Sequence, residues 1–224
     1  MENTYTMTKD STSYQTIESI TLDDYAQRAE QFWLGTRDHD VSQNYQAFLS
    51  AMPDKKGLDI LDFGCGPGRD LYYFSKQGHK PVGLDGCKPF CERARVYSGC
   101  EVLEQSFFAL DLESERFDGI FANASLFHVP SEELPRVLKE FNQALRPGGV
   151  LFTSSPRGSS EGWNGSRYGC FMEFEQYQEY LTQAGFSVLS HYYRPKDKPR
   201  EEQPWLAVVS KKTAYKSGSG SRHI

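Results

Sequence analysis

The stretch that most constrains the fold is Leu58–Leu71, which reads LDILDFGCGPGRDL. It opens with a short apolar run that two aspartates interrupt, continues through three alternating glycines, and passes into a helical pattern. A strand, a glycine-rich turn and a helix N-terminus, in this order, let the backbone approach a ligand closely. The order of these elements therefore predicts a ligand site at the turn. An ordinary tight strand-to-helix turn is the alternative.

The spacing of Gly64, Gly66 and Gly68 disfavours two common nucleotide motifs. A dinucleotide fingerprint needs a glycine three positions after its second glycine, but Arg69 or Leu71 stands there, depending on the glycine from which the count begins. A Walker loop is absent as well, because no Gly-Lys-Ser/Thr follows. What remains is a glycine turn with an acid, Asp62, two residues ahead of it.

Composition and charge narrow the function classes. A chain of 224 residues with 38% hydrophobic and 25% charged residues suits one globular domain. The formal net charge of -5 argues against a broad phosphate-binding face, so we expect no nucleic-acid partner. We also expect no membrane partner and no secretory signal, because no apolar run is long enough for either. The five irregularly spaced cysteines predict reduced thiols in a cytoplasmic protein and no metal site.

Strand-like and helical patterns alternate along the chain, which predicts an α/β fold. We expect one domain over residues 20–211, a disordered segment or linker over residues 1–19 and a flexible tail over residues 212–224. The polar run Ser154–Tyr168 is expected to be a long functional loop. The expected helices are one that begins near Thr21, then Ser42–Ala51, Asp70–Gln77, Pro89–Tyr97, Ser131–Leu145 and Glu173–Gly185. The expected strands are Leu58–Phe63, Lys80–Leu84, Glu101–Gln105, Phe117–Ala124, Val150–Thr153, Phe186–Tyr193 and Trp205–Ser210.

The ends of the second and fourth expected strands carry candidate ligand contacts. Asp85 lies 19 residues beyond Gly66, where doubly wound folds place the acid that binds ribose hydroxyls. Capping the helix that begins near Lys88 is the alternative role, and one carboxylate can serve both. Asn123, Ser125 and His128 follow the fourth strand. Ligands bind outside the carboxyl ends of strands in open α/β sheets, so these side chains should face the ligand.

The glycine turn with its preceding acid resembles motif I of the class I S-adenosylmethionine-dependent methyltransferases, and the RPGGVLF run resembles the turn before their fifth strand. The resemblance covers Asp24–Lys211. It implies a Rossmann-like, mostly parallel seven-stranded sheet with helices on both faces and a terminal antiparallel hairpin. It also implies S-adenosylmethionine as cofactor, with Asp62 in contact with its methionine end directly or through water. Ser106 stands where the family often has an aspartate for the adenine. The implied cofactor-binding residues are Asp62, Gly64, Cys65, Gly66, Gly68, Arg69, Asp85, Gly86, Ser106, Phe107, Asn123, Ala124 and Trp33.

Four unusual runs resemble a narrower family, the C-terminal methyltransferase domain of ovothiol synthase (5-histidylcysteine sulfoxide synthase). They are FWLGTRDHDVSQN, FGCGPGRDL, FANASLFHVPSEELPRVL, and SSPRG…EGWN…RYG with HYYRP…QPWLA. This resemblance implies methylation of the π nitrogen of 5-thiohistidine to give ovothiol A. The sequence shows no three-histidine set for iron, so a sulfoxide synthase domain or protein would act beside it. A different small amine, thiol or acid as acceptor is the alternative, and a binding module that has lost catalysis is a further one.

Two histidines are candidates for the proton chemistry. His128 is the first, because the ordinary pKa of histidine lies near working pH; packing at the strand end is its alternative role. His39 lies between Asp38 and Asp40, whose charges would raise its pKa and favour the cation, which suits binding of a thiolate or carboxylate. The candidate catalytic residues are His128, His39 and Asn123.

An amino-acid acceptor also presents a carboxylate, for which arginine is the best partner. Arg157 is favoured over Arg37 and Arg194 because it follows the fifth strand; surface ion pairs are the alternative for all three. The candidate substrate-binding residues are Arg37, Asp38, His39, Ser125, His128, Arg157, Trp163, Tyr168, Tyr192 and Arg194.

Overall fold

A computed structural model describes residues 13–213 of the chain. The predictions for residues 1–12 and 214–224, which belong to the expected linker and tail, lie outside the described residues.

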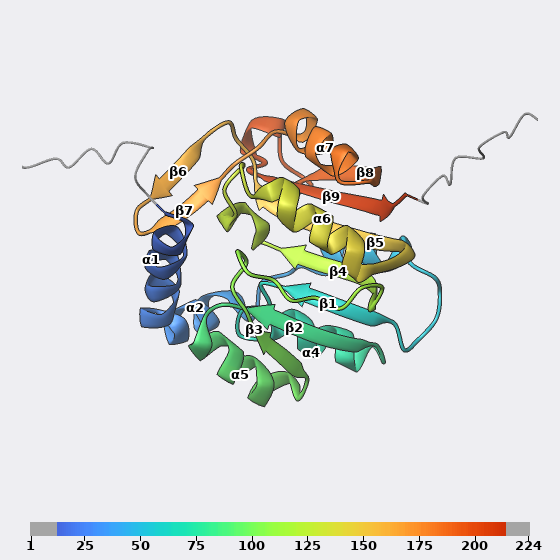
Figure 1. Ribbon diagram of the computed structural model, residues 1–224, viewed down its shortest axis with the longest axis horizontal. Coiled ribbons are helices and arrows are strands. Elements are labelled where there is room, and N and C mark those ends of the chain that lie inside the picture. Colours follow the sequence, from blue (N-terminus) through green and yellow to red (C-terminus); the bar gives the residue numbers. More distant parts are fainter. Residues whose placement is uncertain (1–12, 214–224) are drawn as a thin grey trace, which may run out of the picture.

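Within residues 13–213, seven strands form one sheet in the order β3-β2-β1-β4-β5-β9-β8 (Figure 1). The first five strands along the chain pair in parallel, whereas β9 pairs antiparallel with both β5 and β8. The predicted mostly parallel sheet with a terminal antiparallel hairpin is therefore confirmed. The strands are β1 (Asp59–Phe63), β2 (Lys80–Asp85), β3 (Glu101–Glu104), β4 (Phe117–Asn123), β5 (Leu145–Pro156), β8 (Phe186–Arg194) and β9 (Trp205–Lys212).

Helices cover both faces of the sheet, and the strands at its centre are apolar on both sides, as parallel strands between two helix layers require. On β1, Ile60 and Leu61 are both 0% exposed and belong to different core clusters. The cluster with Ile60 includes residues of α3 (Ser42–Ser50) and α4 (Arg69–Lys76), and α5 (Lys88–Ser98) packs beside α4. The cluster with Leu61 includes residues of α6 (Leu134–Ala144) and α7 (Phe174–Gln183).

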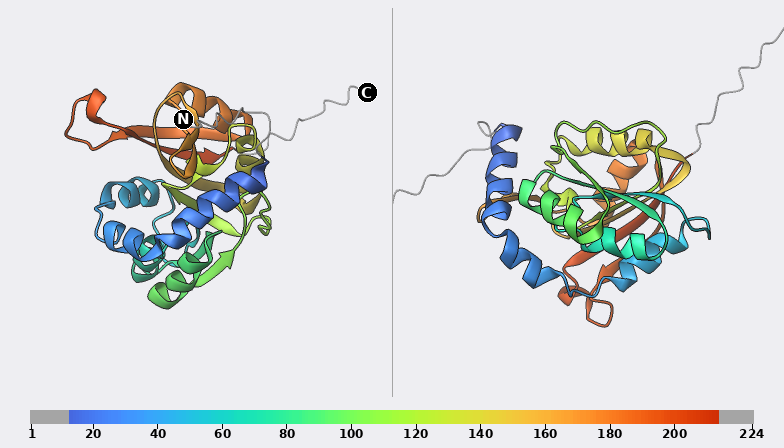
Figure 2. Two further views of the ribbon diagram at one scale, coloured as in Figure 1. Left: turned by 90° about the vertical axis from the view of Figure 1, so that its left-hand side faces the viewer. Right: turned by 90° about the horizontal axis from the view of Figure 1, so that it is seen from below.

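A third group of elements lies at the carboxyl ends of the parallel strands. It contains α1 (Tyr14–Gln27), α2 (Ala29–Thr36) and the hairpin of β6 (Glu161–Asn164) and β7 (Arg167–Cys170), on the side to which the arrows of β1, β2 and β4 point (Figures 1 and 2). The chain passes from β1 outward to β2 and β3 and then crosses to β4 on the other side of β1. Such a switch of direction opens a ligand crevice at the strand ends in this class of sheet.

Several predicted boundaries are wrong. Helix α1 begins at Tyr14, capped by the Ser13 side chain, so residues 14–19 of the predicted linker are helical. The predicted loop Ser154–Tyr168 contains the end of β5, all of β6 and the start of β7. Lys212, assigned to the tail, belongs to β9. Two short 3-10 helices, Leu126–His128 and Arg200–Glu202, complete the described elements.

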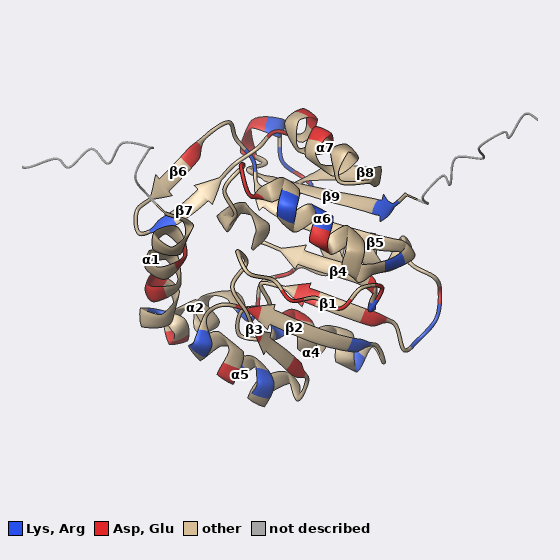
Figure 3. Ribbon diagram, in the orientation of Figure 1, with Lys and Arg blue, Asp and Glu red and all other residues tan. Residues whose placement is uncertain are grey.

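Charged side chains on the outer helices pair locally. Figure 3 shows acidic and basic residues interspersed along α5 and α6, and the pairs include Lys88 with Glu92, and Arg136 with both Glu133 and Glu140. Such pairs stabilise a solvated helix by only a few tenths of a kcal/mol each, about 0.2–0.5. None of the helices within residues 13–213 is long and apolar enough to cross a membrane.

Candidate active site

The loop between β1 and α4 owes its course to its glycines. Gly64 and Gly68 have φ angles of 69° and 96°, in the left-handed region that favours glycine. A Cβ on Gly64 would lie 2.2 Å from the Cβ of Ser125, and one on Gly68 would lie 2.8 Å from the backbone of Ala94. A Cβ on Gly66 would approach no described atom other than the Phe32 ring, at 3.9 Å. Gly64 and Gly68 therefore allow close packing behind the loop, whereas Gly66 faces open space.

Two cavities meet at this loop. The smaller, about 80 Å³, extends toward α1 and the end of β2, and the larger, about 720 Å³, extends toward β7, β8 and the segment between α2 and α3. The larger volume is in the usual range for a small-molecule site. Among the described residues, those that line both cavities, and so mark their junction, are Tyr25, Phe32, Gly64, Gly66, Ala124 and His128.

The smaller cavity contains Asp85, the acid predicted to bind a ribose. Its Oδ2 accepts a hydrogen bond from the Gly66 N–H at 2.9 Å, and its Oδ1 accepts one from the Cys87 N–H at 2.8 Å. The carboxylate therefore supports the glycine loop and the start of α5 at once. Burial raises the pKa of Asp85 to about 6, although these backbone hydrogen bonds oppose the shift.

Aromatic side chains also line the smaller cavity. Phe107 stacks on Phe63 with ring centroids 4.1 Å apart, and Phe108 stacks on Tyr14. Ser106 does not line either cavity; its hydroxyl accepts a hydrogen bond from the Phe108 N–H. Gly86 and Ser125, two other predicted ligand contacts, do line the smaller cavity.

Asp62, expected to contact the cofactor, lies behind the loop and lines neither cavity. It is 1% exposed, and burial together with the nearby charge of Asp70 raises its pKa well above the usual range. Asp70, which the sequence analysis missed, lines the larger cavity instead. Its Oδ1 accepts hydrogen bonds from Tyr45 at 2.5 Å and from Arg69 at 2.6 Å. Asp70 directly follows Arg69, which the sequence analysis did name as a candidate ligand contact, and this position was the available signal.

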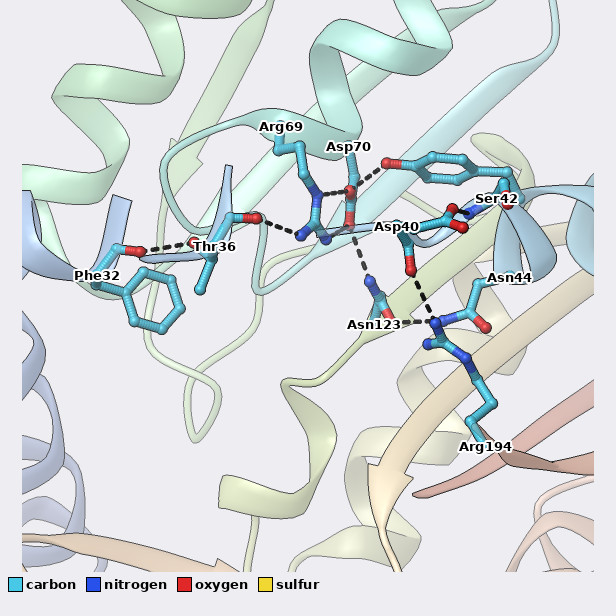
Figure 4. Close-up of polar contacts among 10 residues, drawn as sticks. Phe32, Thr36, Asp40, Ser42, Asn44, Arg69, Asp70, Asn123 and Arg194 are labelled. Atoms are coloured by element: carbon cyan, nitrogen blue, oxygen red, sulfur yellow. Dashed lines mark hydrogen bonds and ion pairs between the residues drawn. The ribbon is translucent and has the colours of Figure 1, made fainter. Parts of the chain in front are cut away.

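A chain of hydrogen bonds runs from Asp70 and Asn123, which line the larger cavity, to Asn44 and Tyr192, which do not. Figure 4 shows its part from Arg69 to Asn44. Asn123 donates to Asp70 at 3.1 Å and accepts from the amide of Asn44 at 3.0 Å, and Asn44 in turn accepts from the Tyr192 hydroxyl at 2.9 Å. Arg69 donates to the backbone oxygen of Thr36, at the end of α2, at 3.0 Å. The predicted residues Asn123, Arg69 and Tyr192 are therefore joined in one network that connects α2, α3, β4 and β8.

His128 has hydrogen-bond partners at both ring nitrogens. Its Nδ1 lies 2.6 Å from the backbone oxygen of Tyr168, and its Nε2 lies 2.8 Å from the Tyr25 hydroxyl. The loss of water around the ring lowers its pKa to about 4, with a smaller contribution from the charge of Arg167. The ring is therefore neutral near pH 7 and is held by α1 on one side and β7 on the other.

The structure separates the three candidate arginines. Arg194 lines the larger cavity, where it donates to the backbone oxygen of Asp40 at 2.9 Å (Figure 4). Arg157, the favoured candidate, lines neither cavity: it donates to Glu173 at 2.9 Å and to the backbone oxygen of Gln203 at 2.7 Å. Arg37 is exposed and pairs with Asp38, and neither of them lines a cavity.

The remaining predicted residues divide in the same way. Trp33, Cys65, His39 and Tyr168 line the larger cavity. Trp163 does not; its ring lies edge-on to Tyr168, at a centroid distance of 5.7 Å. Within residues 13–213, no group of three or more His, Cys, Asp and Glu side chains is arranged to hold a metal ion.

The sequence analysis missed the first half of helix α1, because it expected this helix to begin near Thr21. Ile17, Thr21 and Tyr25 lie on one face of this helix and line the smaller cavity. The Thr21 hydroxyl accepts a hydrogen bond from the Tyr168 N–H, and the buried Asp24 accepts one from Ser166, so α1 is bound to the β6–β7 hairpin. The four-residue spacing of Ile17, Thr21 and Tyr25 was a signal for this helix face.

Comparison with known proteins adds a family match. Residues 60–149 match the model of a family described as a methyltransferase domain. An uncharacterized methyltransferase of Geobacillus kaustophilus is 26% identical over 50% of this chain and 53% of its own length. A malonyl-[acyl-carrier protein] O-methyltransferase of Xylella fastidiosa is 32% identical over 52% of this chain and 41% of its own length. The chain thus spans about half the length of the curated relatives it matches.

Solved structures resemble the chain over most of its length. The 1,6-didemethyltoxoflavin-N1-methyltransferase of Burkholderia thailandensis, with bound 1,6-didemethyltoxoflavin and S-adenosylhomocysteine, has a TM-score of 0.74 and 22% identity, covering 90% of this chain and 91% of that one. A TehB-like S-adenosylmethionine-dependent methyltransferase of Corynebacterium glutamicum has a TM-score of 0.65 and 22% identity, covering 86% of this chain and 98% of that one. At these identities the likeness concerns the fold.

Proposed function

We propose that this chain, which carries a methyltransferase domain in a class I methyltransferase fold, transfers the methyl group of S-adenosylmethionine to a small molecule, with 5-thiohistidine as acceptor and ovothiol A as product. The observation that carries the proposal is the junction of two cavities at the glycine loop. The smaller cavity is lined by a carboxylate and aromatic rings, the larger has the volume of a small-molecule site, and the loop lies where they meet.

The family match and the solved structures support S-adenosylmethionine as the cofactor, and the residues of the smaller cavity fit it. Asp85 offers carboxylate oxygens for the ribose hydroxyls, and Phe107 and Phe108 offer ring faces for the adenine. Gly66 leaves open space where a side chain would otherwise stand. When bound, the cofactor supplies an electrophilic sulfonium methyl, and the protein contributes positioning and electrostatics.

The larger cavity offers charged groups for an amino-acid acceptor. Within residues 13–213 Arg194 forms no ion pair, so its guanidinium is available for a carboxylate. Asp40, beside it, is exposed, and hydrogen bonds from Ser42 lower its pKa, so it stays anionic and suits an ammonium group. We therefore assign the carboxylate contact to Arg194 in place of Arg157, and the ammonium contact to Asp40.

A nitrogen acceptor is supported by the Burkholderia thailandensis enzyme, whose name specifies N1-methylation of didemethyltoxoflavin. A carboxylic acid acceptor is the second candidate, because the Xylella fastidiosa relative is a malonyl-[acyl-carrier protein] O-methyltransferase. For 5-thiohistidine, a sulfoxide synthase domain or protein would supply the substrate. The buried thiols of Cys65, Cys87 and Cys91 fit a reducing compartment, which supports action in the cytoplasm.

The test is a methyl-transfer assay with defined acceptors. The protein is incubated with S-adenosylmethionine and 5-thiohistidine, histidine or malonate, and the products are analysed by mass spectrometry. We expect a product heavier by one methyl from 5-thiohistidine alone. Methylated histidine or malonate without methylated thiohistidine would replace the acceptor assignment, and no methylation of any acceptor, with no binding of the cofactor, would refute the enzyme assignment.

A further inference from the structure

The hydrogen bonds around His128 have a fixed direction. The backbone oxygen of Tyr168 can only accept, so the Nδ1 of His128 carries the proton and donates it. The ring is neutral, so its Nε2 has a lone pair and no proton. The Tyr25 hydroxyl, 2.8 Å away, must therefore donate its proton to this nitrogen.

Tyr25 is then left with an oxygen that can only accept. A phenol hydroxyl has one proton and two acceptor lone pairs, and His128 holds the proton. Tyr25 is partly exposed and lines both cavities, next to Gly66 and Ala124. Arg167 donates a hydrogen bond to one of these lone pairs. The oxygen therefore offers one further lone pair, and no proton, at the place where the two cavities meet.

Neighbouring side chains keep the Tyr25 ring in place. The ring packs edge-on against Phe32 at 5.4 Å between centroids and at a tilt against Phe90 at 5.6 Å. The guanidinium of Arg167 lies 5.1 Å from the ring centroid and is paired with the buried Asp24. Burial raises the pKa of Tyr25 and outweighs a hydrogen bond from the Arg167 side chain, which lowers it, so the hydroxyl keeps its proton at neutral pH.

We propose that the Tyr25 oxygen is the group that receives an N–H of the methyl acceptor at the junction of the two cavities, and that His128 is a positioning residue that fixes its polarity. This inference rests on the proposed function and deepens it, because it selects among acceptor classes. An amine or a ring N–H can donate to Tyr25. A carboxylate presents only lone pairs to the same oxygen, and the two would repel each other. The site therefore favours nitrogen acceptors over acids.

Three cofactor analogues test this polarity without knowledge of the acceptor. Sinefungin carries an amine-bearing carbon in place of the sulfonium methyl, so it presents N–H donors at the junction. The sulfoxide of S-adenosylhomocysteine presents an oxygen that only accepts, and S-adenosylhomocysteine presents neither group. Dissociation constants are measured by calorimetry for the wild type, Tyr25→Phe, His128→Phe and the control Tyr180→Phe, which alters a tyrosine of α7 that lines neither cavity.

We expect the wild type to bind sinefungin at least about ten-fold more tightly than the sulfoxide, because a hydrogen bond to a charged group is worth roughly that factor or more. Tyr25→Phe should weaken sinefungin about ten-fold and change the affinity for S-adenosylhomocysteine less than about two-fold. His128→Phe frees the hydroxyl proton, so the preference for sinefungin over the sulfoxide should shrink. Tyr180→Phe should bind all three ligands as the wild type does.

Equal binding of sinefungin and the sulfoxide by the wild type would overturn the assignment, and this outcome needs no variant to fold. An equal loss of affinity for all three ligands in Tyr25→Phe would also overturn it, since it would show a packing role alone. In both cases the proposed function would stand. If the wild type binds none of the three ligands, the proposed function fails, and this inference fails with it.

Discussion

Replacing Gly64 by alanine separates the two reasons for glycine in the loop. The φ of 69° costs a residue with a Cβ about 1–2 kcal/mol. The new Cβ would also lie 2.2 Å from the Cβ of Ser125, whose hydroxyl donates to the Phe63 backbone oxygen at 2.6 Å. Relieving that overlap must move a buried residue, and overpacking of this kind costs about 1–3 kcal/mol. We therefore expect Gly64→Ala to lower the free energy of unfolding by about 2–5 kcal/mol.

Two matched variants isolate these contributions. Gly57 has a φ of 74°, and a Cβ at this position would meet no described atom within 4 Å, so Gly57→Ala should show the backbone cost alone, about 1–2 kcal/mol. Gly66→Ala, with a φ of 52°, should lose a similar amount of stability. Its methyl group would extend into the junction, however, so we expect it to weaken S-adenosylhomocysteine binding at least about ten-fold, the effect of about 1.4 kcal/mol.

Urea unfolding followed by tryptophan fluorescence gives the stabilities, and calorimetry gives the affinities. The slope of free energy against urea should be the same for all variants, because the surface exposed on unfolding does not change. The reasoning would be refuted by Gly64→Ala being as stable as Gly57→Ala, or by Gly66→Ala binding S-adenosylhomocysteine like the wild type.

Four further outcomes follow from the site. Burial raises the pKa of Asp85 to about 6, and ribose hydroxyls need the carboxylate form, so the affinity for S-adenosylhomocysteine should fall as the pH drops through about 6. Asp85→Asn should bind this ligand weakly and without such a pH dependence. An affinity of the wild type that does not change with pH would contradict this expectation. Folding raises the pKa of Asp85 from its ordinary value of 3.8 to about 6, so the protonated carboxyl is favoured in the folded state. The free energy of unfolding should therefore fall as the pH rises between these two values. Arg194→Ala should raise the KM for the acceptor about ten-fold or more without changing cofactor affinity. Arg157→Ala should leave the KM for the acceptor near the wild-type value. The reverse pattern would restore Arg157 as the carboxylate partner. Asn123→Ala leaves the buried amide of Asn44 without its partner, so the free energy of unfolding measured in urea should fall by about 1–3 kcal/mol. An unchanged unfolding midpoint would show that the network does not stabilise the fold.

The sheet was predictable because local pattern and global fold agree along it. The apolar runs of β1 and β4 are buried on both sides of a parallel sheet, so their composition alone indicates their position. The glycine loop was predictable for a similar reason, since alternating glycines between a strand and a helix have few other uses. Asp85 followed from its distance to that loop.

The position of α1 and of the β6–β7 hairpin over the site was not predictable from local pattern. Helix α1 is polar along much of its length, and its position depends on contacts with residues about 140 positions later, such as Asp24 with Ser166. The β6–β7 hairpin consists of two four-residue strands in a Gly- and Ser-rich stretch, which reads as a loop. Side-chain direction was equally hidden: Arg157 follows β5 as expected, but it turns to Glu173 and away from the cavity. His128 lies where the sequence placed it, yet no pattern showed that Tyr25 occupies its second nitrogen.

A crystal structure with S-adenosylhomocysteine tests the central claim most directly. We expect the adenosine in the smaller cavity, with its ribose hydroxyls on Asp85 and its thioether at the junction beside Gly66 and Tyr25. Electron density for the ligand at another place, or side chains of Phe32 and Phe107 closing the crevice in crystals soaked with it, would contradict the account.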